Sequence, residues 1–195
     1  LSVIPEAKIA AEWGVSAMHD ITEGGVFGAL WEMGSGSGVG LDIDLKEIPI
    51  GSEGLVVLPY FAGERTPIND AHAKGVIFGL NLAHTRKHIM RAAYESVCYS
   101  IRHHFEIFKE LQIPINQIMV TGGGTKNEQW IQMLSDVLGI RLQTPSVTIG
   151  ACYGDALMAM IGANHINNFT EAKKLIDIGK VYYPNLENTL KYEPY

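Results

Sequence analysis

The spacing of hydrophobic positions along the chain predicts short strands that alternate with longer helices. Apolar residues recur with a helical period from residue 86 to about residue 111, and Thr85 stands where it can cap that helix. A second helix is predicted at 128–138. Short apolar runs, typical of buried strands, lie at 55–61, 75–80 and 118–120. The pattern indicates an α/β fold.

The first fifty residues repeat this alternation on a smaller scale. Helices are predicted at 5–13 and 26–33, strands at 15–18 and 39–45, and a polar loop at 19–25. Only a short break, Ile48 to Ser52, separates them from the next apolar run.

Three glycines stand between the strand at 118–120 and the helix at 128–138. Gly122, Gly123 and Gly124 allow positive φ and leave no Cβ in the way of a ligand. The free N–H groups of a helix start favour an anion, so a nucleotide phosphate or ribose would fit here. Asn127 departs from both standard phosphate-binding motifs, and a tight turn without a ligand explains the glycines equally well.

Composition narrows the possible partners. The chain has 195 residues, 47% of them hydrophobic, which is enough for a real core. A net charge of −6 and the lack of long basic clusters argue against nucleic acid and anionic membranes, and no apolar run approaches the length of a membrane span. Cys98 and Cys152 are isolated within helical patterns, which predicts buried thiols, no metal centre and a cytoplasmic location.

Several histidines could suggest a metal site or a proton relay. His84 and His88 have the i, i+4 spacing of two ligands on one helix face, but the sequence places no third ligand, so we predict a structural role. His103, His104 and Arg102 are expected on a solvated face of the long helix.

From residue 51 to residue 195 the sequence resembles the FGGY family of carbohydrate kinases. The motifs that carry the resemblance follow the family's order and spacing: Leu58-Pro59-Tyr60, Gly63-Glu64-Arg65-Thr66-Pro67, Gly75 to Leu80, His88-Ile89, Ala92-Ala93-Tyr94-Glu95, Thr121 to Asn127, and Gly150 to Ala156. The Gly-Glu-Arg-Thr-Pro variant is most similar to the xylulose-kinase branch.

The resemblance implies a ribonuclease-H-like domain of the actin-type ATPase fold, truncated here, that holds the adenosine half of ATP. Motif alignment implies that Gly123, Gly124 and Asn127 face the nucleotide, together with Gly122 of the same turn. It also implies use of Mg²⁺ and a small sugar, and a helix nearby that packs closely through Gly154.

In this family the phosphate loop and the catalytic aspartate come from an N-terminal domain, and no counterpart precedes Gly51. We therefore expect no catalytic residue in this chain, no kinase activity from it alone, and a missing N-terminal lobe or a longer parent chain. Arg65 could face the substrate or close the cleft between lobes, or it could pair with Glu64 and stiffen its loop.

The run from Met18 to Gly25 resembles the start of the C-terminal domain of the AIR-synthase-related superfamily, whose members use ATP. The plain alternative is that Asp20 and Thr22 cap the following helix. We therefore predict two segments of different ancestry, 1–50 and 51–195. Besides the kinase lobe, a non-catalytic fusion or chimeric α/β module and part of an AIR-synthase-related enzyme remain alternatives.

Overall fold

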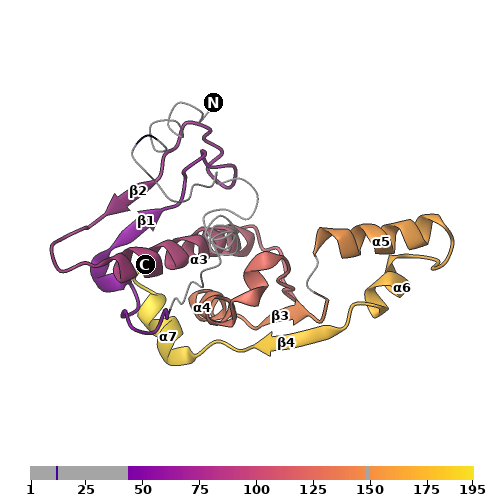
Figure 1. Ribbon diagram of the computed structural model, residues 1–195. Coiled ribbons are helices and arrows are strands. Elements are labelled where there is room, and N and C mark those ends of the chain that lie inside the picture. Colours follow the sequence, from indigo (N-terminus) through magenta and orange to yellow (C-terminus); the bar gives the residue numbers. More distant parts are fainter. Residues whose placement is uncertain (1–11, 13–43, 148–149) are drawn as a thin grey trace. The chain divides into compact units, whose positions relative to one another are not determined.

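The computed structural model describes residue 12 and residues 44–147 and 150–195 (Figure 1). The chain divides into two compact units, Leu1–Ile43 and Asp44–Tyr195, and the second holds the helices and strands given below. The helices predicted at 5–13 and 26–33, the strands at 15–18 and 39–45, and the loop at 19–25 lie outside the described residues, apart from Glu12, Asp44 and Leu45. Asp44 and Leu45 do not form part of a strand, so the end predicted for the strand at 39–45 is wrong.

The longest element is α3, Arg86–Glu110, which confirms the predicted helix. Thr85 is its N-cap residue, and the backbone N–H of Thr85 donates to Nδ1 of His88 at 3.0 Å. This bond satisfies a donor at the helix start, as in a capping box. His88 therefore has a structural role at the start of α3, as predicted for it.

The most buried face of α3 is not the row of apolar residues whose spacing predicted the helix. The residues of that row are only half-buried: Ile89, Ala93, Val97, Ile101, Phe105 and Phe108. The buried positions include two charged side chains, Arg91 and Glu95, together with Tyr94 and Cys98. Burial of charge is costly unless the charges are paired and hydrogen-bonded, so α3 carries a polar network.

Glu95 is the centre of this network. Its carboxylate accepts from Ser52 Oγ at 2.8 Å and from Arg91 Nε at 2.8 Å. Arg91 also donates to the hydroxyl of Tyr192 at 3.0 Å and to the backbone oxygen of Leu45. One ion pair thus joins α3 to the segment that precedes β1 and to the C-terminal helix.

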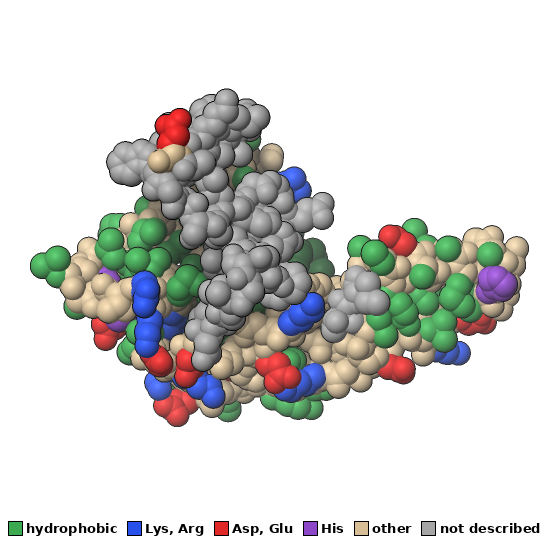
Figure 2. Space-filling model, viewed as in Figure 1, with side chains coloured by type: hydrophobic (Ala, Val, Ile, Leu, Met, Phe, Trp, Pro, Cys, Tyr) green, Lys and Arg blue, Asp and Glu red, His purple; other side chains and the backbone are tan. Residues whose placement is uncertain are grey.

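A two-stranded antiparallel sheet packs on α3 through one of its faces. Strands β1, Val56–Leu58, and β2, Val76–Phe78, pair with Val57 opposite Ile77. Val57 is buried with Leu55 and Ala92. Because side chains alternate across a strand, Leu58 and Phe78 point away from α3, and their exposed fractions are 41% and 72%. Figure 2 shows apolar side chains gathered over these strands.

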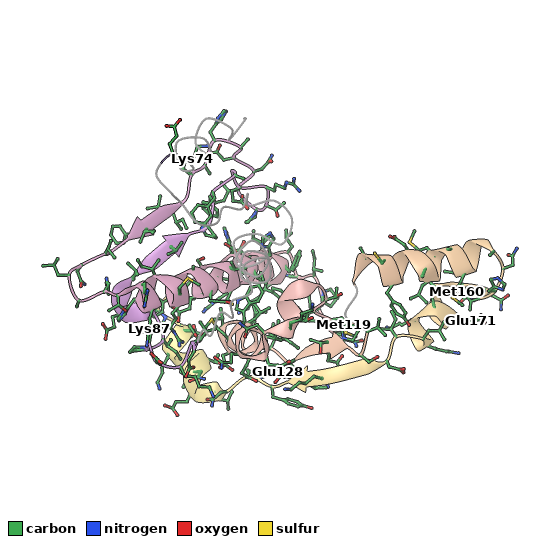
Figure 3. All side chains as sticks on the ribbon, viewed as in Figure 1. Lys74, Lys87, Met119, Glu128, Met160 and Glu171 are labelled. Atoms are coloured by element: carbon green, nitrogen blue, oxygen red, sulfur yellow. The ribbon has the colours of Figure 1, made fainter. Side chains whose placement is uncertain are left out.

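A second sheet lies beside α4, Glu128–Leu138, which also confirms its prediction. Strands β3, Leu142–Pro145, and β4, Ile178–Tyr182, run antiparallel side by side in Figure 1. Met119, labelled in Figure 3, forms a parallel bridge with Gln143 of β3. The strand predicted at 118–120 is thus an extended segment that pairs with β3.

The remaining elements are short. They are the 3₁₀ turns η1, Ser52–Gly54, and η2, Gly123–Lys126, and the helices α5, Ala151–Gly162, α6, Phe169–Lys174, and α7, Leu186–Tyr192. The described part of the chain contains both helices and strands, as the α/β prediction requires. Among the described residues the strands form two small sheets and not one large ribonuclease-H-like sheet.

Helix α5 packs against α6. No described atom lies within 4 Å of a Cβ built at Gly154, so the close packing expected through Gly154 stays a prediction. Cys152 is exposed, whereas Cys98 is buried, so only one of the two predicted buried thiols is confirmed. Within the described ranges no helix is both long and apolar enough to span a membrane.

Candidate functional site

The extended segment 118–120 and strand β3 run parallel side by side, and each leads towards a glycine turn. Gln143 of β3 donates to the Ile118 oxygen at 3.1 Å and accepts from the Val120 N–H at 2.7 Å, which aligns β3 with 118–120. The first strand leads into Gly122 and then α4, and β3 leads towards Gly150 and α5. Carboxyl ends of parallel strands are where open α/β folds bind ligands.

The two turns touch. A Cβ added at Gly150 would lie 3.4 Å from Oγ1 of Thr121 and 3.8 Å from Cα of Gly122. Gly150 has a φ of 66° and is the N-cap residue of α5. The start of α5 therefore meets the start of the 3₁₀ turn η2, Gly123–Lys126, where the dipole of a helix start favours an anionic or polar ligand.

The three consecutive glycines differ in whether the backbone conformation or a neighbouring atom excludes a side chain. Gly122 has φ 100° and ψ −178°, a backbone conformation open almost only to glycine. A Cβ at Gly124 would lie 2.3 Å from Cζ3 of Trp130, so the indole ring packs directly against this residue. At Gly123 neither reason applies, because φ is not positive and no described atom lies within 4 Å of the Cβ position.

The turn is fastened by its own hydrogen bonds. The hydroxyl of Thr125 donates to the Gly122 oxygen at 2.7 Å, and Asn127 N–H donates to the Gly124 oxygen at 3.1 Å. Asn127 is the N-cap of α4, and its Oδ1 accepts from Trp130 N–H at 3.1 Å. Capping is thus one confirmed contact of Asn127.

Behind the turn lies an aromatic pair. The rings of Trp130 and Tyr94 meet edge to face with centroids 5.8 Å apart, and Trp130 Nε1 donates to the backbone oxygen of Tyr94 at 3.3 Å. Trp130 is half-buried. Burial raises the pKa of the Tyr94 hydroxyl, and the hydrogen bond from Asn127 opposes that shift.

The second candidate loop is organised by Glu64. Its carboxylate accepts from the backbone N–H groups of Thr66 at 2.8 Å, Ile68 at 2.8 Å and Asn69 at 3.0 Å. The structure therefore stiffens this loop through backbone amides, and no ion pair joins Glu64 to Arg65 among the described residues. Arg65 is exposed.

The predicted solvated face of α3 is only partly correct. His103 is exposed, but His104 bridges the Ser100 oxygen at 2.7 Å and the Thr66 hydroxyl at 2.9 Å. The half-buried Arg102 donates to the backbone oxygen of Tyr192 at 3.1 Å. These residues tie the Glu64 loop and the chain end to α3.

In the part of the chain that the structure describes, no group of three or more His, Cys, Asp or Glu side chains could hold a metal ion. The rings of His84 and His88 are tilted against each other with centroids 5.3 Å apart, and Nε2 of His88 lies 3.3 Å from Oε2 of Glu53. The described residues thus do not fit a site for Mg²⁺.

A groove lies along α4, and none of residues 122–127 lines it. Its volume is about 570 Å³, and among its lining residues are Glu128, Asp136, Lys180 and Lys191. Glu128, labelled in Figure 3, pairs with Lys180, and Asp136 accepts from Asn185 N–H at 2.8 Å. Because these charged groups bind one another or the backbone, and no predicted site residue lines the groove, we do not assign the site there.

Two contacts of this arrangement could not be predicted from the sequence. Tyr94 stands in one of the motifs of the family resemblance, but it lies 33 positions before Asn127 and no local pattern connects the two residues. Gly150 was noted as part of a motif, but its contact with Thr121 depends on the parallel pairing of β3 with 118–120.

Comparison with known proteins agrees with this fold. Residues 41–163 match the C-terminal domain of the FGGY family of carbohydrate kinases, and residues 2–66 match the C-terminal domain of AIR synthase related protein. The chain belongs to the FGGY family of carbohydrate kinases. The two matched ranges overlap at 41–66, so a boundary at residue 50 stays a prediction.

Individual relatives are sugar kinases. Over 150 residues the chain is 34% identical to the xylulose kinase of Bacillus subtilis, which covers 76% of this chain and 30% of the relative. It is 33% identical over 127 residues to the gluconokinase of the same organism, covering 65% of this chain and 25% of the relative. The crystal structure of xylulose kinase from Rhodospirillum rubrum superposes with a TM-score of 0.65 at 31% identity, covering 77% of this chain and 30% of that one. This chain thus spans about a third or less of the length of these relatives.

Proposed function

We propose that the unit from residue 44 onward forms the adenosine side of the ATP site of a sugar kinase, and that Gly122, Gly123, Gly124 and Asn127 face the nucleotide. The observation that carries the proposal is Gly123. Among the described residues nothing requires glycine there, neither φ nor a neighbouring atom. A glycine that neither its φ nor a neighbouring atom requires leaves space in which a ligand can approach the backbone closely.

The placement of the turn supports the same proposal. Gly123 belongs to a turn at the carboxyl end of one of two parallel strands, and the start of a second helix lies against the same turn. Residues 121–127 carry no carboxylate, so this turn can bind a nucleotide but cannot itself supply a base for phosphoryl transfer.

We propose a ketose such as xylulose as the substrate of the complete enzyme, because relatives of similar sequence are named xylulose kinases. Phosphoryl transfer needs Mg²⁺ and a catalytic carboxylate. We assign both to a lobe that this chain does not span. The chain alone should then bind ATP and not turn over a sugar.

Titration with ATP, followed through backbone amide shifts of residues 122–127, tests the binding. An assay of the same chain with a panel of ketoses tests the activity. Saturable shifts without turnover are expected. No response at millimolar ATP would reject the nucleotide role, and turnover by the chain alone would reject the assignment of catalysis to another lobe.

A second candidate follows from the match of residues 2–66 to AIR synthase related protein. In that case the chain is a fusion of two unrelated segments that folds as a non-catalytic α/β module, or it is part of an ATP-using enzyme of that second family. Binding of ATP that shifts only amides before residue 44 would favour this candidate over the kinase lobe.

A further inference from the structure

Tyr94 lies on α3, far along the chain from the glycine turn, yet it contacts both residues that shape the turn. Its hydroxyl accepts from Nδ2 of Asn127 at 3.4 Å, and its backbone oxygen accepts from Nε1 of Trp130 at 3.3 Å. Tyr94 itself is buried, with 5% of its surface exposed. One fixed residue thus holds two others at the start of α4.

Each of these two contacts acts on a different part of the turn. The ring of Trp130 lies directly against Gly124, so its position sets where the backbone of Gly124 can lie. Asn127 has a planar amide whose Oδ1 accepts from Trp130 N–H at 3.1 Å while its Nδ2 donates to Tyr94. Bonds at both ends of the amide fix its orientation.

This orientation has a chemical consequence for a ligand. An amide nitrogen has two hydrogens, and only one of them is used by Tyr94. With Oδ1 held by the cap, Asn127 offers the ligand a donor, which suits an acceptor atom such as a ribose oxygen or a ring nitrogen of a base. Without Tyr94 the amide could rotate and the donor would no longer be fixed.

We infer that Tyr94 is a positioning residue of the nucleotide site and acts through the amide of Asn127. The inference rests on the proposed function, because it concerns the same turn. Ordering a binding group before the ligand arrives lowers the entropic cost of binding. The effect should appear with adenosine as well as with ATP, because the contact is on the nucleoside side.

The variant Tyr94→Phe tests this inference in the full chain. It removes the hydroxyl and keeps the ring and the backbone oxygen that Trp130 uses. We expect the Kd for ATP and for adenosine to rise by about three- to tenfold, the range that corresponds to one neutral hydrogen bond. Tyr99→Phe is the matched control, because Tyr99 is on the same helix and its buried hydroxyl has no hydrogen-bond partner among the described groups. Its Kd values should equal those of the wild type.

A double variant separates positioning from general loosening. Asn127→Ser keeps a capping hydroxyl but has no amide. If Tyr94 acts through that amide, adding Tyr94→Phe to Asn127→Ser should leave the Kd unchanged.

Three results would overturn the inference and leave the proposed function intact. They are wild-type affinity in Tyr94→Phe, an equal loss in Tyr99→Phe, and a loss that persists in the Asn127→Ser background. Failure of the wild-type chain to bind ATP or adenosine would instead overturn the proposed function, and the inference with it.

Discussion

Nε of Arg91 donates to Oε1 of Glu95 at 2.8 Å, one helical turn apart on α3, and the exposed fractions of the two side chains are 8% and 1%. Removing one partner of a buried ion pair leaves the other charge without compensation. We predict that Glu95→Ala lowers the free energy of unfolding by about 3–5 kcal/mol. Urea unfolding of the full chain measures this change.

An ion pair on the same helix whose carboxylate is exposed is the control. Arg102 donates to Glu106 at 3.1 Å, and the Glu106 side chain is 56% exposed. Glu106→Ala should cost less than about 1 kcal/mol. Equal losses in Glu95→Ala and Glu106→Ala would show that the buried network does not join α3 to its neighbours as described.

The loop at 63–70 should depend on Glu64 and not on Arg65. In Glu64→Ala the backbone amides of Thr66, Ile68 and Asn69 lose their acceptor, so their hydrogen exchange should become faster while exchange in α3 stays unchanged. Arg65→Ala should leave exchange of these three amides at the wild-type rate. Faster exchange in Arg65→Ala would point instead to the pairing with Glu64 that the sequence suggested.

The helices were predictable because their signals are local. Thr85 precedes an unbroken helical pattern, and α3 begins at the next residue. The buried face of α3 was not predictable, because charged residues such as Arg91 and Glu95 are usually exposed unless they are paired. Their partners lie in distant segments of the chain. Ser52 and Tyr192 bind Glu95 and Arg91 from forty or more residues away.

The site was predictable to a similar extent. Gly122, Gly123 and Gly124 predict a turn from the sequence alone, but the structural role of each glycine depends on tertiary structure. Trp130 explains Gly124 only once the ring is placed. The exposure of Cys152 was missed because α5 has an apolar sequence, which usually indicates burial.

The two thiols should react at very different rates. Cys152 is exposed, whereas Cys98 is fully buried and its pKa is raised, chiefly by burial. Because the thiolate is the reactive form, a thiol reagent such as DTNB should modify one cysteine of the native chain quickly and the second only after unfolding. Cys152→Ser should abolish the fast reaction. Two fast thiols in the native chain would contradict the packing of α3.

Stability should fall at alkaline pH. Burial raises the pKa of Tyr99 and of Tyr192 above the ordinary tyrosine value. The unfolded chain then loses these protons first, so the stabilisation is complete below pH about 10 and is lost as the pH rises towards the folded-state pKa values. Urea midpoints at pH about 8 and about 10.5 should show the decrease, and Tyr99→Phe should make it smaller. A midpoint that rises with pH in this range would contradict the prediction.

Gly123 is proposed to leave space for a nucleotide, and a matched pair of alanine variants at neighbouring glycines tests this role. Gly124→Ala would press on the Trp130 ring and should cost about 1–3 kcal/mol of stability. Gly123→Ala meets no described atom and has a compatible φ, so the unfolding free energy should stay the same or rise by up to about 1 kcal/mol.

The deciding measurement is the Kd of ATP for the stable variant Gly123→Ala beside the wild type, taken from amide shifts in one buffer. We predict a Kd at least about tenfold higher for Gly123→Ala, because a new Cβ would occupy space used by the ligand. An unchanged Kd in a variant of unchanged stability would contradict the assignment of this turn to the nucleotide.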